Sequence, residues 1–211
     1  MPLIIGVVSP KGGSGKTTTA IHLARSIQQT GDDVLILDTD PQGSAYAWHS
    51  RQSDGYSVPV VHADTDDVSG ALGDLGNPPP VVVIDGAAKI EPRTGRIVRS
   101  SDVCVIPVQP TPLDSWGVEQ VVAAVRQSGT PAAFLITQQK ARTNLAKQVA
   151  DGLRNQYEIP VLDSRLSHRV AFAESMFAGR TALDVSGSSK AKQEVRALTT
   201  ELKEFIQRHA G

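Results

Sequence analysis

A glycine-rich segment near the N-terminus has the residue types and the spacing of a phosphate-binding loop. Residues 10–18 lie between an apolar run and a helical pattern and read Pro10-Lys11-Gly12-Gly13-Ser14-Gly15-Lys16-Thr17-Thr18. Glycines let backbone N–H groups turn toward a phosphate without Cβ clashes, and a helix N-terminus adds free donors and a favourable dipole. We therefore predict a nucleotide site built from Gly12, Gly13, Ser14, Gly15, Lys16, Thr17 and Thr18.

Two side chains of this segment have specific expected roles. Lys16 is expected to reach the β- and γ-phosphates, and the Thr17 hydroxyl is expected to ligate Mg²⁺. The expected cofactors are therefore ATP and Mg²⁺.

Two later apolar runs end in carboxylates. One ends Leu37-Asp38-Thr39-Asp40-Pro41-Gln42, and the other ends Val83-Ile84-Asp85-Gly86-Ala87. A carboxylate at the C-terminal end of a parallel strand beside a phosphate loop faces the ligand crevice. Asp85 is expected to hold Mg²⁺ through a water, and Gly86 is expected to offer its N–H to the γ-phosphate. Capping of the following helix is the alternative role for Asp38 or Asp40.

The elements that must position these residues alternate along the chain. Short apolar runs predict strands over residues 3–8, 34–37, 81–84, 103–108 and 132–136. Helical patterns cover residues 16–29, about 43–51, 115–127, 144–157 and 190–209. This alternation predicts an α/β fold with a doubly wound, mostly parallel sheet and helices on both faces.

The composition suits one globular domain spanning residues 1–211. Hydrophobic residues make up 40%, charged residues 20%, and the net charge is −1. The single cysteine, Cys104, excludes a disulfide framework within the chain and is expected to be a buried, inert thiol. No apolar stretch approaches the ~18 residues of a membrane span, so we expect a cytoplasmic protein without a membrane partner.

The C-terminal helical pattern has an apolar face at helical spacing. Membrane binding by an amphipathic helix is one interpretation, and packing of this narrow face on the sheet is the favoured one.

The phosphate loop resembles that of a known family. Pro10 stands where the usual first glycine would be, and Lys11 adds a second lysine at the start of Lys-Gly-Gly-Ser-Gly-Lys-Thr. This sequence motif resembles that of the deviant Walker A family, which includes ParA, MinD and the nitrogenase iron proteins. The resemblance implies a weak ATPase that forms an ATP-dependent homodimer, with Lys11 crossing to the phosphates of the partner subunit. A solvated loop lysine is the alternative for Lys11.

The carboxylate segments are similar to the switches of the same family. By that match Asp40 would orient or deprotonate the attacking water, and Asp38 would support the Mg²⁺ shell and the loop geometry. The resemblance thus gives Lys11, Lys16 and Asp40 as catalytic residues and Thr17, Asp40 and Asp85 as metal-site residues. The Asp-Gly-Ala sequence at residues 85–87 resembles the corresponding segment of the short ParF-like partition ATPases.

A proline-rich segment, residues 106–114, covers the C-terminal end of the fourth predicted strand and the residues after it. By the same resemblance this stiff loop lines the nucleotide and the dimer face through Pro107, and Asp114 caps the next helix. A rigid turn with no further role is the alternative.

Residues 167–175, Ser-His-Arg-Val-Ala-Phe-Ala-Glu-Ser, resemble the C-terminal signature of the family. The resemblance implies that Arg169 contacts DNA, with a surrounding patch of Arg165, Arg180, Lys190 and Lys192. Residues 111–211 hold 13 Lys/Arg against 10 Asp/Glu, which hints at an anionic partner. Phosphate contacts carry no sequence information, so this DNA binding is expected to be non-specific and salt-sensitive. Ordinary surface charge is the alternative for each of these residues.

Together these features predict a nucleoid-associated partition ATPase of the ParA type, without an N-terminal helix-turn-helix, that works with a small centromere-binding adaptor protein. A ParA-like ATPase that positions a protein compartment is one alternative. A P-loop ligase of the dethiobiotin synthetase type is another, although the Asp-Thr-Asp-Pro-Gln segment disfavours it. A MinD-like ATPase would need a basic amphipathic tail, and an iron protein would need two ligating cysteines per subunit.

Overall fold

A seven-stranded sheet organises the chain, and its neighbouring strands are parallel throughout. The computed structural model describes residues 1–53, 57–63, 65, 67–87, 91–111, 117–140 and 144–209. The strand order is β3-β2-β4-β1-β5-β6-β7. Their bounds are β1 Leu3–Val7, β2 Val34–Asp38, β3 Val60–His62, β4 Val81–Asp85, β5 Val103–Val108, β6 Ala132–Gln139 and β7 Val161–Ser167. The predicted parallel α/β fold is therefore confirmed.

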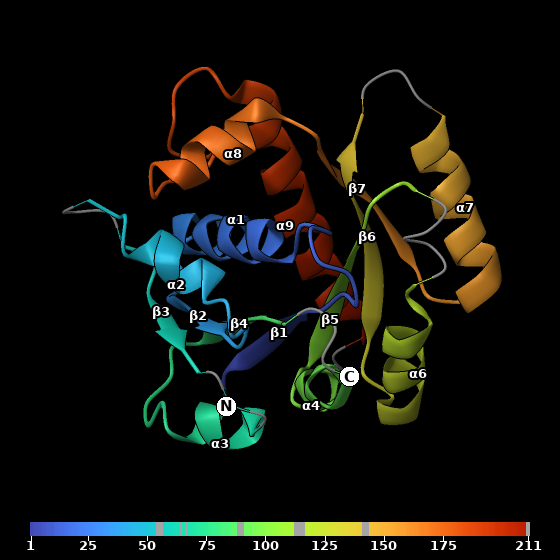
Figure 1. Ribbon diagram of the computed structural model, residues 1–211, viewed down its shortest axis with the longest axis horizontal. Helices are drawn as coiled ribbons and strands as arrows, with labels where there is room; N and C mark the ends of the chain where they lie inside the picture. The colour runs from blue at the N-terminus through green and yellow to red at the C-terminus, as the bar shows by residue number, and fades with distance from the viewer. Residues whose placement is uncertain are drawn as a thin grey trace.

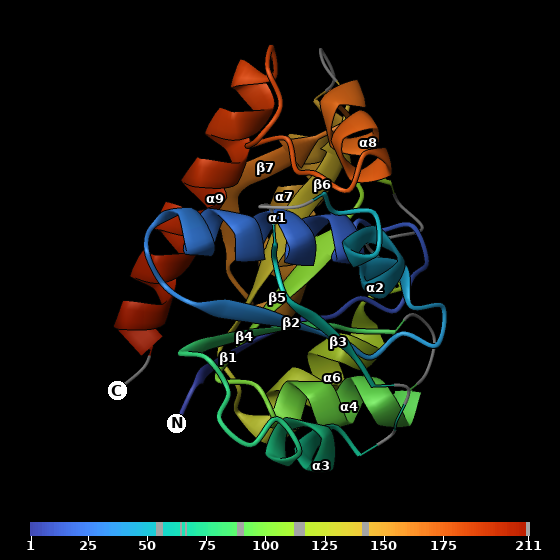
Figure 2. The ribbon, with the colours of Figure 1, turned by 90° about the vertical axis from the view of Figure 1, so that its left-hand side faces the viewer.

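Helices cover both faces of the sheet (Figures 1 and 2). One face carries α1 (Lys16–Gln29), α2 (Ser44–His49), α8 (Val170–Phe177) and α9 (Ser189–His209). The other carries α3 (Val68–Gly73), α4 (Glu91–Arg99), α6 (Glu119–Ser128) and α7 (Leu145–Tyr157). Each layer buries its own apolar cluster against the sheet, which explains why the central strands are apolar on both sides.

The central strands match the predicted runs because they are continuously apolar. β2 and β4 read Val-Leu-Ile-Leu-Asp and Val-Val-Val-Ile-Asp, and every residue in both is buried. The edge strands β3 and β7 were not predicted: β3 has only three residues, and β7 is half polar. Edge strands need less apolar surface, so their sequence signal is weaker.

Two predictions about individual elements are confirmed. Cys104 is buried in β5, and this burial raises the pKa of its thiol to about 12, which makes it inert at neutral pH. The apolar side of α9 packs into the core through Val195, Leu198, Leu202 and Phe205 rather than facing outward. Within the described residues, no helix is both long and apolar enough to cross a bilayer.

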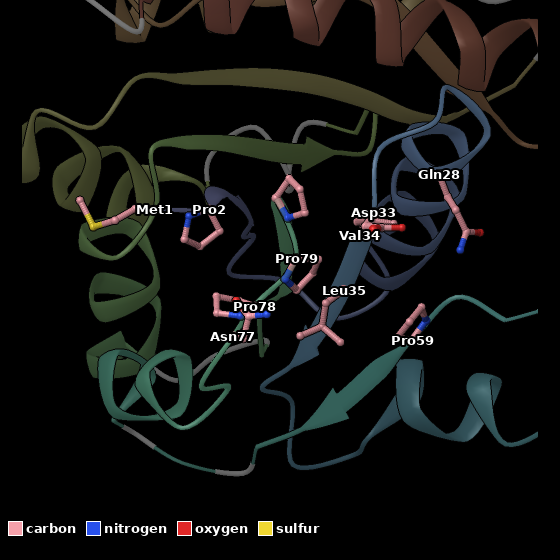
Figure 3. Close-up of a pocket in the computed structure, with 11 residues that line it drawn as sticks. Met1, Pro2, Gln28, Asp33, Val34, Leu35, Pro59, Asn77, Pro78 and Pro79 are labelled. Carbon is pink, nitrogen blue, oxygen red and sulfur yellow. The ribbon is translucent and has the colours of Figure 1, made fainter.

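A hollow of about 910 Å³ opens at the end of the sheet where β1, β2, β3 and β4 begin (Figure 3). Its walls carry Met1, Pro2, Gln28, Asp33, Val34, Leu35, Pro59, Asn77, Pro78, Pro79 and Pro80. The predicted phosphate loop, Asp40 and Asp85 lie at or after the opposite, C-terminal ends of the strands. This hollow is therefore separate from the predicted nucleotide site.

Candidate active site

The register of the parallel strands brings the three predicted motifs to one edge. Asp85, the last residue of β4, pairs with Val7 of β1 on one side and with Asp38 of β2 on the other. The glycine-rich loop starts just after Val7. Three segments far apart in sequence therefore end side by side, as the C-terminal ends of parallel strands require.

The phosphate loop depends on glycine at its tightest points. Gly13 and Gly15 have φ angles of +77° and +92°, which side chains rarely tolerate, and Gly15 immediately precedes α1. Helix α1 begins at Lys16, as predicted, and its first turn includes Thr17 and Thr18. The structure thus has the loop-to-helix junction that a phosphate site needs.

The two lysines of the loop lie in different environments. Lys16 is only 6% exposed, and its Nζ donates to the carbonyl of Lys11 at 3.0 Å. Burial lowers the pKa of Lys16, while the carboxylates of Asp85 and Asp40 oppose this shift. Lys11 itself is exposed. Lys16 is therefore held inside its own subunit, and Lys11 is placed at the surface.

Asp85 has the environment of a cation ligand. It is fully buried, and within the described part of the chain neither of its oxygens has a hydrogen-bond partner. Burial and, to a smaller extent, the neighbouring charge of Asp38 raise the pKa of Asp85 to about 7, although the Thr17 hydroxyl and the charge of Lys16 act in the opposite direction. Neither of these two groups meets hydrogen-bond geometry with Asp85.

A buried carboxylate without a partner is costly, and a bound cation would remove that cost. Asp85 and Thr17 therefore fit the Mg²⁺ that accompanies a nucleotide. The described residues contain no cluster of three or more His, Cys, Asp or Glu that could hold a metal. Mg²⁺ is usually held by one or two protein ligands together with phosphates and waters, so two ligands from the chain suffice.

Asp38 holds the loop that follows β2. Its carboxylate accepts the N–H of Asp40 at 3.1 Å and the N–H of Tyr46, in the first turn of α2, at 3.0 Å. Burial raises the pKa of Asp38, and these hydrogen bonds counter the rise. Asp38 therefore accepts one N–H of the first turn of α2, although Gly43 is the N-cap residue of this helix. These bonds agree with the predicted part of Asp38 in the loop geometry.

Asp40 lies on this braced loop and is partly exposed. Its Oδ1 accepts the N–H of Gln42 at 2.9 Å. Its carbonyl accepts from Gly43 N–H at 2.8 Å and lies 3.0 Å from the Nε2 of His62 on β3. These bonds fix the loop that carries the Asp40 carboxylate.

Sequence reasoning missed two residues that brace this edge. Arg93 of α4 is buried and donates from Nη1 to the carbonyl of Thr39 at 2.8 Å. His62 supports Asp40, as described above. Neither residue belongs to a motif, so only the tertiary structure reveals these contacts.

The prediction for Gly86 is wrong in this conformation. Its N–H donates to the carbonyl of Val7 at 3.0 Å and so is not offered to a γ-phosphate. A Cβ at this position would lie 2.9 Å from the same carbonyl. Close approach of two strand ends, rather than phosphate binding, explains the glycine here.

Pro107 lies within β5 and is buried. Pairing of β5 with β1 ends at Val105, so a proline is tolerated two residues later. Gln109, the residue after β5, reaches the phosphate loop. The predicted Asp114 cap and Pro112 lie outside the described residues, as does residue 115, where the predicted helix starts.

A cavity of about 180 Å³ adjoins the phosphate loop on the α8 side. Gly15 and Thr18 form its loop side, Thr137 and Gln138 come from β6, and Phe172 comes from α8. Arg169 also borders this cavity. This lining, which the sequence did not predict, could hold the part of a nucleotide beyond its phosphates.

Arg169 is engaged inside the chain. Its Nη2 lies 2.5 Å from Oε1 of Glu194 on α9, its side chain is 31% exposed, and its Nε is buried without a partner among the described residues. Glu194 also accepts from the N–H and the hydroxyl of Ser167. The predicted DNA contact of Arg169 therefore stays a prediction. To bind a DNA phosphate, the guanidinium would have to leave Glu194 or contact both groups at once.

The other members of the predicted basic patch differ in accessibility. Arg165 is half-buried and donates to the carbonyls of Leu162 and Ser164, and Arg180 donates to the hydroxyl of Ser53. Lys190 is exposed, and Lys192 is partly exposed. Lys190 is thus the most accessible member of this patch.

Comparison with known proteins agrees with this geometry. A family model described as the CobQ/CobB/MinD/ParA nucleotide binding domain matches residues 5–182. The maintenance of carboxysome distribution protein A of Gloeobacter kilaueensis is 29% identical over 204 residues, which cover 95% of this chain and 94% of that protein. The chromosome-partitioning ATPase Soj of Thermus thermophilus is 28% identical over 239 residues, which cover 96% of each.

A solved structure shows the same fold. The septum site-determining protein MinD of Pyrococcus horikoshii, complexed with Mg-ADP, superposes with a TM-score of 0.78 at 18% identity, covering 97% of each chain. The predicted ParA/MinD resemblance is thereby confirmed. The chain belongs to the CobQ/CobB/MinD/ParA nucleotide-binding family and is an ATPase whose cofactors are ATP and Mg²⁺.

Proposed function

We propose that this chain is a ParA-type partition ATPase that pairs around ATP and binds DNA non-specifically while paired. The observation that carries the proposal is the contrast between the buried Lys16 and the exposed Lys11. Lys16 suffices for the phosphates of its own subunit. A second lysine at the surface suits the phosphates of a partner, where a cation supplied in trans offsets the charge developing on the transferred phosphoryl group.

The residues of the carboxylate edge would share the work of hydrolysis. Lys16 binds and orients the β- and γ-phosphates, and Asp40 positions the attacking water on the loop that Asp38 fixes. Asp85 and Thr17 would hold Mg²⁺, which, when bound, offsets the charge of the triphosphate. Since Lys11 completes each pocket only from the other subunit, hydrolysis would depend on pairing.

DNA binding would follow from pairing, because two copies of a modest basic patch face one DNA. Arg169, Lys190 and Lys192 are the proposed contacts, and an adaptor bound at the centromere would stimulate hydrolysis and release. Chromosome-partitioning ATPase Soj, similar over nearly the whole chain, supports a role in partition. In this proposal the protein associates with the nucleoid only in its ATP state.

Retention on random-sequence duplex DNA tests the proposal. The wild type should bind with a non-hydrolysable ATP analogue and Mg²⁺, release with ADP, and lose affinity steeply as salt rises. Arg169→Ala should keep ATP-dependent pairing but lose retention, whereas Arg208→Ala, at the exposed end of α9, should behave as the wild type. Equal retention with ATP analogue and ADP would refute the proposed switch, and full retention by Arg169→Ala would refute the assignment of that residue.

Positioning of a protein compartment is a second candidate function, because a similar protein is named for the maintenance of carboxysome distribution. The two candidates differ in cargo. If the cargo is a plasmid, cells that carry the Lys16→Ala allele should lose that plasmid at a raised frequency. Unchanged plasmid retention together with clustered protein compartments would favour the second candidate.

A further inference from the structure

Three side chains, one just after β5 and two near the end of β6, donate hydrogen bonds to two consecutive carbonyls of the phosphate loop. The Nε2 of Gln109 lies 2.6 Å from the carbonyl oxygen of Gly13, and the Nε2 of Gln138 lies 2.5 Å from the same oxygen. The hydroxyl of Thr137 donates to the carbonyl of Ser14 at 2.6 Å. We refer to Gln109, Thr137 and Gln138 together as the carbonyl latch.

The latch determines where the loop N–H groups point. In a trans, planar peptide the carbonyl of one residue and the N–H of the next point in opposite directions. Fixing the carbonyls of Gly13 and Ser14 therefore fixes the N–H groups of Ser14 and Gly15, which are two of the predicted phosphate donors. Without these bonds the flexible glycines would allow the same peptides to rotate.

The two glutamines are arranged to share one acceptor. A carbonyl oxygen has two lone pairs, so Gly13 can accept from both amides at once. The amides come from neighbouring strands, since β5 and β6 pair in parallel register up to Val108 and Ile136. Loss of one amide would leave the carbonyl held by the other.

The backbone of Gln138 shows that its position is demanding. Its φ is +52°, in the left-handed region that residues other than glycine and asparagine rarely adopt. Such strain costs on the order of 1 kcal/mol and persists where the surroundings enforce it, most often at functional sites. The hydrogen bond from the Gln138 amide to the phosphate loop is an interaction that this strained backbone permits.

We propose that Gln109, Thr137 and Gln138 are positioning residues that orient the phosphate loop for nucleotide before the nucleotide arrives. They act through the loop backbone rather than on the reacting atoms. The proposal rests on the ATPase activity of the family and is independent of pairing and of DNA binding, so it can fail while those proposals stand.

Calorimetric titration with ADP and Mg²⁺ tests the latch, using Gln109→Ala, Gln138→Gly and the double variant. Each single change should weaken ADP binding about threefold, because the second amide still holds Gly13. The double variant should lose about thirtyfold or more, which exceeds the product of the two single effects. Gln127→Ala, at an exposed position on α6, is the matched control and should bind as the wild type.

Three further measurements separate positioning from a merely structural role. Amide hydrogen exchange of residues 12–16 in the nucleotide-free protein should be faster in the double variant than in the wild type. The unfolding temperature of Gln138→Gly should be unchanged or higher, because glycine relieves the strain at φ +52°. Thr137→Val should weaken ADP binding, and Thr137→Ser, which keeps the hydroxyl, should restore it.

The contradicting results are distinct from these. ADP binding by the double variant within twofold of the wild type, or a loss no larger than the product of the single effects, would overturn the shared latch. A fall in the unfolding temperature of Gln138→Gly that parallels its loss of affinity would show that Gln138 serves the fold instead.

Discussion

The carboxylate edge around Asp85 and the β7–α9 region around Arg169 differ in whether their charged side chains have partners within the chain. Both oxygens of Asp85 are buried without a hydrogen-bond partner among the described residues. Arg169, by contrast, is paired with Glu194, which also accepts two hydrogen bonds from Ser167. A second glutamate of α9, Glu201, accepts the N–H groups of Asp163 and Ser164.

This difference shows which region is incomplete without a ligand. A buried carboxylate that lacks a partner lowers the stability of the free protein and is retained where a ligand completes it. A region whose charges already satisfy one another is stable by itself and must give up internal bonds to bind something else. The structure therefore supports nucleotide and metal binding at the first region more directly than DNA binding at the second.

The largest expected effect is at Lys16, within the incomplete region. Lys16→Ala should weaken ADP binding by a factor of about 100 or more, because it removes the buried cation that would face the phosphates. Titration calorimetry measures this loss. Lys147→Ala, at an exposed position on α7, is the control and should leave the affinity unchanged; near-normal binding by Lys16→Ala would remove the phosphate assignment.

Asp85→Asn should stabilise the nucleotide-free protein while abolishing the Mg²⁺ dependence of nucleotide binding. The pKa of Asp85 in the folded protein is raised to about 7, so the unfolded chain releases this proton at a lower pH than the folded protein does. The folded wild type therefore loses stability as pH rises from about 4 to 7. The variant should therefore unfold with a free energy higher by up to about 4 kcal/mol at pH 8, and with no gain near pH 4. Denaturant unfolding at the two pH values checks this; a variant less stable than the wild type at pH 8 would show that Asp85 is already well paired.

His22 of α1 links the first turn of that helix to the segment between α8 and α9, and protonation of its ring should weaken this link. Its Nδ1 lies 2.8 Å from the carbonyl of Thr18, and its Nε2 accepts the N–H of Ala182 at 3.0 Å, so the ring is held neutral. Burial lowers the pKa of His22 to about 4 from 6.5. Its contribution, on the order of 3 kcal/mol, should be present above pH 6.5 and lost as pH falls toward 4.

The stability difference between the wild type and His22→Asn, followed across pH by denaturant unfolding, isolates this slope. The asparagine keeps a donor near Thr18 but does not titrate. A difference that stays constant from pH 8 to pH 4.5 would contradict the neutral, doubly bonded histidine.

The smallest expected effect is the coupling between Arg169 and Glu194. A double-mutant cycle with Arg169→Ala and Glu194→Ala should give a coupling free energy of about 1 kcal/mol, since the pair is partly shielded from solvent. Glu194→Ala alone should destabilise more than Arg169→Ala, because it also removes the acceptor for Ser167. A coupling near zero would mean that the guanidinium is already available for an external phosphate.

The sequence predicted the incomplete region well and the satisfied region poorly. Glycines, lysines and aspartates at strand ends have few structural substitutes, so residues 10–18, Asp40 and Asp85 could be placed at one edge of the sheet before any coordinates. Helix α1 was predicted with its observed bounds for the same reason.

Other features escaped because they depend on tertiary contacts. Helix α4 contains Pro92 and Gly95, which hide its helical pattern. Two of these features join residues distant in sequence: Arg93 supports Thr39, and Arg169 pairs with Glu194. The left-handed backbone of Gln138 likewise shows no signal in the sequence. Gly86 was misassigned because a glycine can serve either phosphate binding or the close approach of two backbone segments. Only the structure shows the close carbonyl of Val7.

Light scattering coupled to size-exclusion chromatography tests the central claim most directly. With a non-hydrolysable ATP analogue and Mg²⁺, the wild type should elute with twice the mass of one chain, whereas Lys11→Ala should bind the same nucleotide and remain a monomer. A wild-type protein that stays monomeric when saturated with the analogue, or a Lys11→Ala protein that pairs as readily as the wild type, would contradict the account.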